Sequence, residues 1–445
     1  MSLLQMQDDL IRTDVTVIGG GLAGMASSIH LARAGLQVAC IEPAMYDDTI
    51  VGESLDWSAP ELLRGLGLPM DRLLADEIAT WKRHVIVRLH GGTTFHYVPG
   101  PWLARSPWKV ELRTLHVDRI RLREALRQIF FDTNAALVND RVSNVERTGH
   151  RVTALTTQSG KRVASRWFID ASGSAASLFP RRFKLPAFTF GPRKVALWSY
   201  FDAPDSVEGT TLHTEGKQPP YMDWVWEIPI HPRRISVGYV AAAESIREWR
   251  QRGMTIEQIY QEQVSRIPRF KSLFESATPA AVHVTSFQCR AHRGVAGPNW
   301  LVVGEAAAMI DPMTSNGVTA ALRTAEEASH IILRSHSRSQ LPRVASALYS
   351  RRAFEMACFF NSGIEAIVYN RPVRNTLGIG KAGRVYIVPA WLMNLLYTRL
   401  RPRGPVSTLS FCLVLSSFRT AARFFHWLCQ RFQAPSPRPA GLVST

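Results

Sequence analysis

A strand, a glycine-rich turn, a helix and a second strand follow one another near the start of the chain, and this order constrains the fold more than any other feature. Asp14-Val-Thr-Val-Ile18 is an apolar strand, residues 25–35 have helical spacing and end at Gly35, and Leu36–Ile41 is a second short strand. This order predicts a βαβ unit, because parallel strands need a crossover between them. The chain is therefore predicted to be an α/β protein whose first unit binds a nucleotide.

The turn of this unit carries Gly19-x-Gly21-x-x-Gly24, directly after a strand and at the start of a helix. In a dinucleotide site the first glycine permits the tight turn, the second lets a pyrophosphate approach the backbone, and the third lets the helix lie close to the strand. The helix N-terminus then offers unpaired N–H groups to the phosphates. Glu42 ends the second strand 18 residues after Gly24, where a carboxylate accepts hydrogen bonds from ribose hydroxyls and repels a 2′-phosphate.

Two later turns extend the predicted site. Phe168-Ile-Asp170-Ala-Ser-Gly173 is a strand that ends in an acid and a glycine. Trp300-Leu-Val-Val-Gly304-Glu305 is another such strand, and Asp311-Pro312 follows it just before a helix. An acid in this place suits a ribityl hydroxyl, and the helix N-terminus can face the pyrimidine edge of a flavin. Three separated turns fit one long cofactor, so the sequence predicts FAD rather than NAD.

A second string with the same glycine spacing, Gly378-Ile-Gly380-Lys-Ala-Gly383, follows no strand. We interpret it as a coincidence of spacing, because a dinucleotide turn must come directly after a strand. No separate nicotinamide domain is then predicted. The electrons are expected to come from transiently bound NAD(P)H or from a separate flavin reductase.

The composition is that of an ordered globular protein, since 46% of the 445 residues are hydrophobic and 20% are charged. The five cysteines are scattered and form no CxxC pair, so neither a disulfide framework nor a metal site is predicted. The first residues lack the pattern of a secretory signal, and no stretch reaches the roughly 18–20 apolar residues that span a bilayer. We therefore expect a cytoplasmic protein.

The net charge of +17 is concentrated in the last quarter of the chain, where 16 basic and two acidic residues follow position 330. A polyanionic partner and a solvated basic face explain this charge equally well, and no nucleic-acid-reading motif accompanies it, so no nucleic-acid partner is predicted. Residues 417–432 form one predicted helix with Phe418, Phe425 and Phe432 on one face. Such a helix either makes a peripheral contact with the inner face of a membrane or covers the substrate pocket with its apolar side.

Strand-like runs interrupt the nucleotide-binding part twice, at residues 84–98 and again at residues 195–240. These excursions are too long to be loops, so a second, mainly antiparallel sheet is predicted. The expected division of the chain is an FAD-binding domain at 1–80, 110–185 and 285–338, a substrate-domain sheet at 81–109 and 186–284, and a basic helical C-terminal region at 339–445.

Five pieces of the sequence together resemble the flavin-dependent halogenase-like branch of the FAD-dependent monooxygenase superfamily, over about residues 12–335. The resemblance implies a Rossmann-like, glutathione-reductase-type FAD-binding fold, with Gly52, Glu53, Ser54 and Arg119 also beside the cofactor. The five pieces are Gly19–Gly24, Val51-Gly52-Glu53-Ser54, Asp170–Gly173, Trp224-Val-Trp226-Glu-Ile-Pro229 and Gly304–Gly317.

The resemblance also implies roles for two tryptophans and one lysine. Trp224 and Trp226 match the WxWxIP signature of these halogenases, whose tryptophans lie between the flavin and the substrate pocket. Two indoles two positions apart on a strand point the same way, which makes either a dry pocket wall or a packed core. Lys82 stands near the family's essential lysine, which directs hypohalous acid made at the flavin to an aromatic carbon. The alternative for Lys82 is a surface lysine beside Arg83.

One turn departs from the tryptophan-specific members of that family. In Asp311-Pro312-Met-Thr314-Ser315-Asn316-Gly317, Thr314 stands where those members carry a glutamate, and Met309 replaces an aromatic residue ahead of the turn. Free tryptophan is therefore not the expected substrate. Ser315 and Asn316 match the turn at which the family binds chloride, and they are candidates for a halide site.

The resemblance implies an enzyme in which reduced FAD and O2 form a hydroperoxyflavin that halogenates or oxygenates an electron-rich aromatic or natural-product intermediate. The expected partners are a small-molecule, carrier-bound or protein substrate and a separate flavin reductase. Two alternatives stay open. One is a flavin hydroxylase acting on a tryptophan or another group of a partner protein, and the other is a membrane-associated reductase of isoprenoid-type double bonds.

Overall fold

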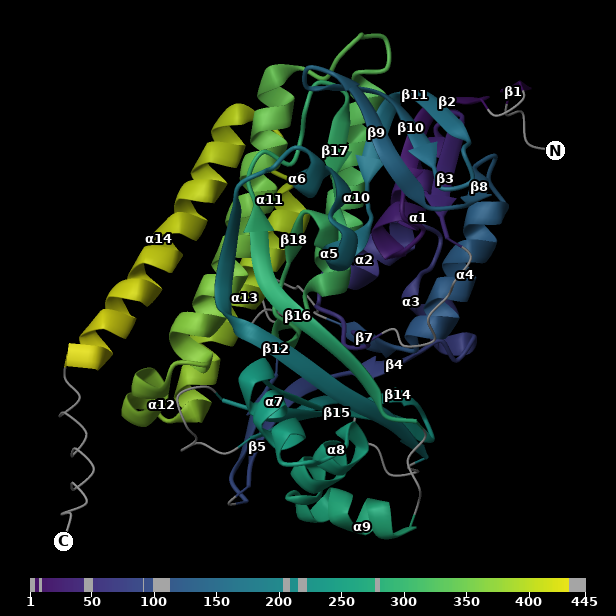
Figure 1. Cartoon of the computed structure of the whole chain (residues 1–445). Coiled ribbons are helices and arrows are strands. Elements are labelled where there is room, and N and C mark those ends of the chain that lie inside the picture. Colours follow the sequence, from purple (N-terminus) through teal and green to yellow (C-terminus); the bar gives the residue numbers. More distant parts are fainter. Residues whose placement is uncertain are drawn as a thin grey trace, which may run out of the picture.

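The computed structural model of the chain describes residues 5–7, 10–43, 51–90, 92–98, 113–202, 209–214, 222–276 and 281–431. Two large sheets lie in different parts of the molecule, and long helices from the end of the chain run along one side (Figure 1).

The first sheet is built around the predicted βαβ unit. Strand β2 (Leu10–Ile18), helix α1 (Leu22–Arg33) and strand β3 (Val38–Glu42) follow one another, and the two strands pair in parallel. Strand β11 (Arg162–Asp170) lies parallel to β2 on its other side, and β17 (Trp300–Val302) lies parallel to the last residues of β11. The carboxyl ends of these strands share one edge, where open α/β sheets bind their ligands. The remaining strands of this sheet are β1 (Gln5–Gln7), β8 (Ala136–Asn139), β9 (Val142–Thr148) and β10 (Arg151–Thr157).

Helices cover the first sheet and bury its apolar core. Asp118 caps helix α4 (Arg119–Phe131), since its carboxylate accepts the N–H groups of Ile120 and Arg121. Helix α10 (Gly317–Arg334) packs against α1. The shorter helices of this part are α2 (Ala59–Gly65), α3 (Met70–Ala75), α5 (Gly173–Ala176) and α6 (Leu178–Arg182).

The second sheet is mainly antiparallel, as predicted, and both of its faces are apolar. One face packs against the C-terminal helices, and the other packs against α7 (Ala243–Gln251), α8 (Ile256–Ser265) and α9 (Pro268–Ser276). In spatial order its strands are β18 (Ala308–Met309), β16 (His283–His292), β12 (Ala187–Asp202), β15 (Arg234–Ala242), β14 (Trp224–His231), β13 (Gly209–Thr214), β5 (His84–Leu89) and β6 (Thr94–Tyr97).

Two segments pair differently from the expected division. Strand β16 pairs with β12, so residues 285–292, expected in the FAD-binding domain, lie in the second sheet. Strand β4 (Ala79–Lys82) pairs with β7 (Thr114–Val117) in a separate two-stranded sheet, so Lys82 is not part of the second sheet. Periodicity along the chain marks these strands, but their partners depend on residues far away in the sequence.

The C-terminal region is helical, as predicted, but its boundaries differ. One of its helices begins at Arg371, because Asn370 caps it and Pro372 suits a first turn. The last helix begins at Pro405 rather than at residue 417. The helices of this region are α11 (Arg343–Gly363), the π-helix η3 (Ile364–Val368), α12 (Arg371–Leu377), α13 (Ile379–Leu400) and α14 (Pro405–Arg431).

The second glycine string lies in α13 and serves packing. A Cβ atom at Gly380 would lie 2.3 Å from the Phe95 ring, and one at Gly383 would lie 2.8 Å from the Tyr97 hydroxyl. The two glycines let α13 rest directly on strand β6, so their spacing reflects a helix contact and not a nucleotide turn.

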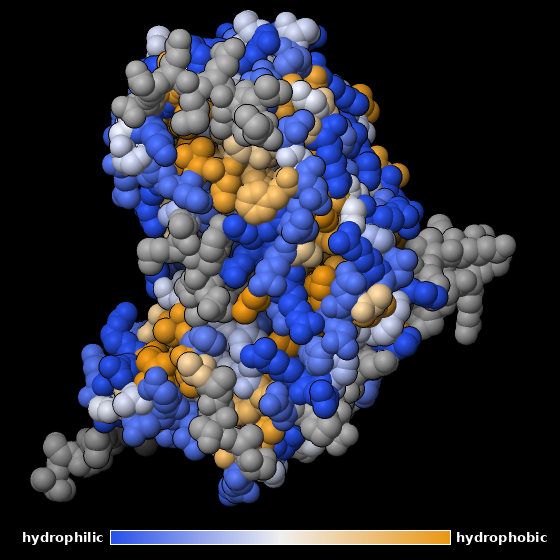
Figure 2. Space-filling view, turned by 90° about the vertical axis from the view of Figure 1, so that its right-hand side faces the viewer, coloured by the Kyte–Doolittle hydropathy of each residue, from blue (hydrophilic) through white to orange (hydrophobic). Residues whose placement is uncertain are grey.

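Hydrophilic side chains cover most of the face shown in Figure 2, and the hydrophobic ones form separate areas. Within the described ranges, every helix is too short or too polar to cross a lipid bilayer.

Candidate active site

The first glycine turn is shaped to hold a phosphate. Gly19 has a φ angle of +100°, and a Cβ atom at Gly24 would lie 1.7 Å from the carbonyl oxygen of Gly19. The Cβ position of Gly21 has no atom within 4 Å, so this side of the turn is open. Helix α1 has no side-chain cap. Its first N–H groups are thus available to an anion.

Glu42 lies against this turn, as the sequence predicts. Its Oε2 atom accepts a hydrogen bond of 2.7 Å from the N–H group of Gly20. Burial raises the pKa of Glu42 above its ordinary value. A half-buried carboxylate beside the phosphate turn is placed to accept hydrogen bonds from ribose hydroxyls.

The other two predicted turns meet the first one at the edge of the sheet. A Cβ atom at Gly19 would lie 2.4 Å from the carbonyl oxygen of Ala171, and one at Gly304 would lie 2.9 Å from Ala23. The carboxylate of Asp170 accepts the N–H groups of two residues of its own turn, Ser172 and Phe179. Asp170 therefore shapes the turn that contains Gly173.

Glu305 is the exposed acid of this edge, and its Oε2 atom accepts a 3.0 Å hydrogen bond from the Ser174 hydroxyl. It follows that Glu305, unlike Asp170, keeps its carboxylate at the surface of the cofactor site, where a ribityl hydroxyl could reach it.

The residues around Gly52 form a compact group between the two sheets. The guanidinium of Arg119 donates to the carbonyl oxygen of Gly52 at 3.0 Å. The Oε1 atom of Glu53 accepts a 3.0 Å hydrogen bond from the Ser236 hydroxyl, and burial raises the pKa of Glu53. The predicted residues Gly52, Glu53, Ser54 and Arg119 are thus brought together.

The turn from Asp311 to Gly317, called the late turn from here on, presents an unsatisfied polar group. Asp311 caps the 3₁₀ turn η2 (Pro312–Thr314), and Ser315 follows in the left-handed conformation, with a φ angle of +54°. Asn316 begins helix α10, and among the described atoms its buried Nδ2 atom has no hydrogen-bond partner. An unpaired buried amide beside an uncapped helix start is the kind of group that a flavin edge would satisfy. The residues at the three turns therefore fit FAD.

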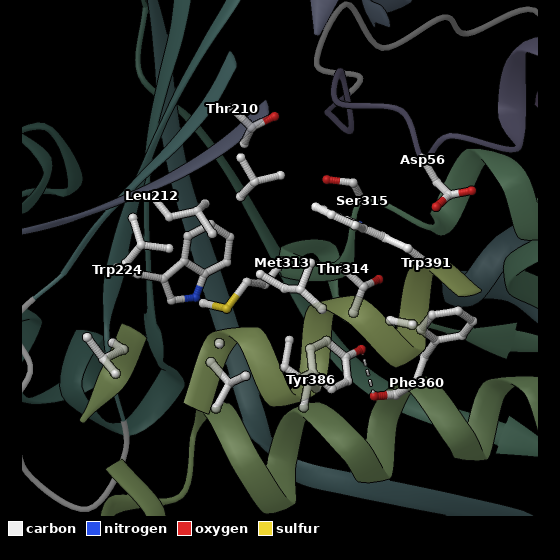
Figure 3. A pocket seen from close by; sticks show the side chains of 18 of the residues that line it. Asp56, Thr210, Leu212, Trp224, Met313, Thr314, Ser315, Phe360, Tyr386 and Trp391 are labelled. Carbon is white, nitrogen blue, oxygen red and sulfur yellow. Dashed lines mark hydrogen bonds between the residues drawn. The ribbon is translucent and has the colours of Figure 1, made fainter. Parts of the chain in front are cut away.

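An apolar cavity opens beside the late turn. Its space, including its open mouth, is about 830 Å³. Trp224 and Trp391 lie on two of its sides, with Met313 between them (Figure 3). The polar groups in its wall are few, namely those of Asp56, Lys82, Thr210, Thr214, Thr314, Ser315, Tyr386 and Asn394. A mainly apolar cavity of this kind suits an apolar aromatic ligand.

Lys82 lies in the wall of this cavity and is only 2% exposed, so it is not a surface lysine. Its Nζ atom donates to the carbonyl oxygen of Leu55 at 2.7 Å and lies 4.8 Å from the centre of the Trp57 ring. Burial lowers the pKa of Lys82 to about 7, against the opposing effect of Asp56. Near neutral pH its amine can therefore exchange between the charged and neutral forms.

Of the two predicted wall tryptophans, only Trp224 lines the cavity. Its Nε1 atom donates to the Tyr369 hydroxyl at 3.0 Å. Trp226 lies behind it, donates to the Ser236 hydroxyl at 3.0 Å and packs over Gly238, where a Cβ atom would lie 2.0 Å from the indole. Trp226 thus supports the wall rather than forming it.

A chain of hydrogen bonds links the late turn to a buried histidine. The Ser315 hydroxyl lies 2.9 Å from that of Ser54, which lies 2.7 Å from that of Thr210, which lies 3.0 Å from the Nε2 atom of His116. Burial and then the charge of Lys82 hold the pKa of His116 well below its ordinary value, so the imidazole is neutral. This series of hydrogen bonds holds the Ser315 hydroxyl in place.

A buried ionic cluster holds the other side of the late turn. The Nζ atom of Lys194 lies 2.8 Å from Asp311 and 2.9 Å from Glu365. The Tyr369 hydroxyl donates to Asp311 at 3.2 Å and accepts from Trp224. The cluster therefore connects the cavity wall, the late turn and the C-terminal helices.

Sequence reasoning found the turns and Lys82 but missed most of the cavity wall. Asp56 stands two residues after the Gly-Glu-Ser loop, and that position is the one signal that could have pointed to it. His116, Thr210, Lys194 and Tyr369 have no motif that marks them. Residues of α13, which include Trp391, cover the cavity, whereas no described residue of the predicted helix at 417–432 lines it.

The chain is similar to two protein families and to several curated proteins. The tryptophan halogenase family model matches residues 103–356, and the lycopene cyclase protein model matches residues 14–190. Tryptophan 2-halogenase of Chondromyces crocatus is 29% identical over 334 residues, which cover 70% of this chain and 59% of that protein. The chain spans about three fifths of the length of this and two further curated halogenases.

Two other relatives differ in their named activities. The 1H-pyrrole-2-carbonyl-(peptidyl-carrier protein) chlorinase of Pseudomonas fluorescens is 26% identical, with 72% of this chain and 75% of that protein covered. Menaquinone reductase of Mycolicibacterium smegmatis is 26% identical, with 72% of this chain and 76% of that protein covered.

Among solved structures, the flavin-dependent brominase Bmp2 has a TM-score of 0.68 at 19% identity, with 95% of this chain and 100% of that chain covered. This likeness concerns the fold, and it agrees with the two sheets and the helical C-terminal region described above. Since the family model covers more than half of the residues, the chain belongs to the tryptophan halogenase family.

Proposed function

We propose that this chain is an FAD-dependent enzyme that uses reduced flavin and O2 to halogenate an electron-rich aromatic or natural-product intermediate. The observation that carries this function is Lys82, a buried amine in the wall of an apolar cavity that also contains the Ser315 turn. A structural lysine is normally exposed, and a buried one with a lowered pKa in a cavity is a candidate for catalysis.

The residues of the three turns would hold the cofactor. Gly19, Gly21, Gly24 and Glu42 would bind the adenosine diphosphate half, with Gly52, Glu53, Ser54 and Arg119 beside it. Glu305 and the turn from Asp311 to Gly317 would bind the ribityl and ring half. Bound FAD, when reduced, would supply the electrons that activate O2. The unpaired amide of Asn316 and the hydroxyl of Ser315 are the groups that would meet a halide.

The cavity would orient the substrate and exclude water. Trp224 and the side chains of α13 form a rigid apolar wall, and an oxidised halogen species survives longer where water is scarce. The ammonium of Lys82 would donate a hydrogen bond to that species and bring it to the aromatic carbon. Thr314 in place of the glutamate leaves this side of the cavity without the carboxylate that an amino-acid substrate would need, which favours a less polar substrate.

One incubation tests the proposal. Purified protein is mixed with reduced FAD, O2, bromide or chloride and a panel of phenols, pyrroles and indoles, and the products are analysed by mass spectrometry. A product with the halogen isotope pattern supports halogenation. A product heavier by one oxygen atom supports the flavin hydroxylase, whose substrate could be a tryptophan of a partner protein.

A reductase of isoprenoid-type double bonds is the second candidate. It is favoured by the match to the lycopene cyclase model and by the likeness to a menaquinone reductase. Such an enzyme needs no O2, so turnover of a prenylated substrate under anaerobic conditions would select it over the halogenase.

Three partners belong to the proposal. A carrier-bound substrate is supported by the likeness to a carrier-protein chlorinase and by the basic charge of the C-terminal region. A separate flavin reductase would supply the reduced cofactor, because no second nucleotide turn is available in the described residues. Peripheral contact with the inner face of a membrane is the third, and it concerns the outer surface of the last helices.

A further inference from the structure

Helix α14 carries large apolar side chains on the face that points away from the protein. At 3.6 residues per turn these side chains fall within about 60° of one another around the helix. They lie opposite the buried Phe411, Leu415 and Cys429, so the helix is apolar on both faces. We call them the outer stripe, and they are Val406, Leu409, Leu413, Phe424 and Trp427, each between 44% and 79% exposed.

The segment of the chain that carries the outer stripe is basic, although four of its arginines pair with acids of other elements, namely Arg399, Arg401, Arg403 and Arg419 with Glu61, Glu326 and Glu355. From residue 366 to the end of the chain there are eleven basic residues and no acidic one. Arg423 and Arg431 are exposed on the same helix, and the Arg431 guanidinium lies 4.6 Å from the centre of the Trp427 ring. A second copy of this chain would bring two such basic surfaces together, so the charge favours an anionic partner.

The shape of the surface favours a lipid interface over an acidic protein. Helix α14 forms the outer edge of the molecule, and its stripe runs along a single convex helix of 27 residues, about 40 Å long at 1.5 Å per residue (Figure 1). Protruding apolar side chains need complementary pockets in a protein partner, whereas the headgroup–acyl boundary of a bilayer accepts apolar side chains without shape complementarity. Aromatic and arginine side chains together suit that boundary.

We propose that the outer stripe of α14 docks on an anionic lipid surface, with the helix lying in the plane of the interface. Apolar burial would provide the contact, and the arginines would select a negatively charged surface.

Helix α13 lies between the cavity and a second exposed apolar surface. It lines the cavity with Tyr386 and Trp391, and it exposes Val385, Val388 and Leu392 on its other side. A single helix therefore separates the apolar cavity from the protein surface. If the cavity has the proposed function, an apolar substrate held in the lipid could enter past this helix. This route of entry rests on the proposed function, whereas the docking does not.

Vesicle flotation tests the docking with the full chain. We expect the protein to float with phosphatidylcholine vesicles that contain phosphatidylserine, and to bind vesicles of pure phosphatidylcholine more weakly. The double variant Leu413→Glu/Phe424→Glu should reduce the bound fraction by about tenfold or more, since it places two charges in the apolar contact. The control is Phe131→Glu on α4, which alters a side chain of similar exposure, 52% against 58% for Phe424, far from the stripe.

The outcomes separate the alternatives. Equal binding by wild type and double variant, or no binding by wild type, overturns the proposal. A wild-type dimer that becomes a monomer in the double variant, as measured by light scattering, would assign the stripe to a second copy and also overturn it. Thermal unfolding shows whether the variants are folded. Flotation needs neither flavin nor turnover, so its failure and a failure of the halogenation assay are distinct results.

Discussion

Lys82 is the residue on which the chemistry of the cavity depends. Its ammonium is buried beside an indole ring and has one described hydrogen bond, to the carbonyl oxygen of Leu55. An ammonium in this environment has N–H groups to offer to a ligand, and its low pKa means that the environment does little to stabilise the charge.

Lys82→Ala is therefore expected to lower the halogenation rate by about 10²–10⁴-fold, the usual effect of removing a group that handles protons. Binding of FAD should persist, because the glycine turns do not involve Lys82. The measurement is the product yield per bound flavin, with flavin binding followed by its yellow absorbance. Arg83→Ala, which alters the exposed neighbour, serves as the control and should keep the wild-type yield.

The pH dependence of the rate should report the charge of Lys82. Its pKa is about 7 in the folded protein, so the ammonium is lost as the pH rises through this value. If the ammonium is the hydrogen-bond donor, the rate falls above about pH 7. Initial rates between about pH 6 and pH 9, at saturating flavin, measure this. A rate that rises over the same range would mean that the neutral amine acts instead, as a nucleophile.

At the scale of elements, the late turn is held by hydrogen bonds from three directions. The hydroxyl chain fixes Ser315, Asn361 of α11 bonds to both Met309 and Asp311, and Asn394 of α13 donates to the Oδ1 atom of Asn316 at 2.9 Å. The Ser315 conformation is left-handed, which is uncommon for a residue other than glycine. These bonds stabilise a turn that its own sequence does not favour.

Removing the Thr210 hydroxyl, which lies in the series of hydrogen bonds behind Ser315, should make this turn less rigid. Thr210→Val keeps the shape but removes the hydroxyl, and we expect it to raise the KM for halide by about tenfold, the worth of one buried hydrogen bond. Thr210→Ser restores the hydroxyl and should restore the KM. The neighbouring Thr211→Val, on the opposite face of β13, is the control. If Val and Ser at position 210 gave the same KM, the hydroxyl would have no role.

The contact between α1 and the glycine turn allows no side chain. Gly24→Ala would place a Cβ atom 1.7 Å from the Gly19 oxygen, so the helix must move away from the phosphate site. We expect a loss of about 1–3 kcal/mol in the free energy of unfolding and a strong loss of flavin binding. Urea unfolding and flavin titration measure the two effects. The control is Gly65→Ala in α2, where no atom lies within 4 Å of the Cβ position, and it should lower neither the free energy of unfolding nor flavin binding.

Local patterns predicted the elements of this protein well, because they depend on neighbours in the chain. The βαβ unit and the strands of the second sheet both follow from spacing and turn residues. The lysine in the cavity wall came from the resemblance and not from periodicity. Its burial, which gives it its low pKa, depends on partners such as Leu55 that only the fold brings close.

The missing part of the site has a common physical cause. Asn361 and Met309 are 52 positions apart, and Trp224 and Tyr369 are 145 positions apart. No motif marks such pairs, because ordinary residue types make these contacts. The pairing of β16 with β12 escaped prediction for the same reason. The residues after 431, which include Phe432 of the predicted helix, lie outside the described residues.

At the scale of the whole molecule, Lys194 connects three parts that are distant in the sequence. It extends from β12 and lies 1% exposed between Asp311 of the late turn and Glu365 of the π-helix. Burial opposes its charge, but Asp311 and Tyr369 raise the pKa of Lys194 above its ordinary value. The cation therefore stays charged over the normal pH range and neutralises two carboxylates.

Lys194→Met should destabilise the fold by about 3–5 kcal/mol, since it leaves buried carboxylates without their cation. Thermal unfolding measures this effect. As a control, Lys271→Met removes an exposed lysine of α9 and should change the stability little. An unchanged melting temperature in Lys194→Met would show that the cluster is dispensable.

The close contact of α13 with β6, made at its glycines, has a practical consequence for the engineering of a new catalyst from this protein. Because Gly380 and Gly383 anchor the helix on β6, the side chains that it turns toward the ligand, such as Ile387 and Trp391, can be trimmed or enlarged without moving the helix itself. A small library of substitutions at these positions would change the shape of the cavity on the side formed by α13. Lys82, the turn from Asp311 to Gly317 and the first glycine turn belong to other elements and would remain unchanged.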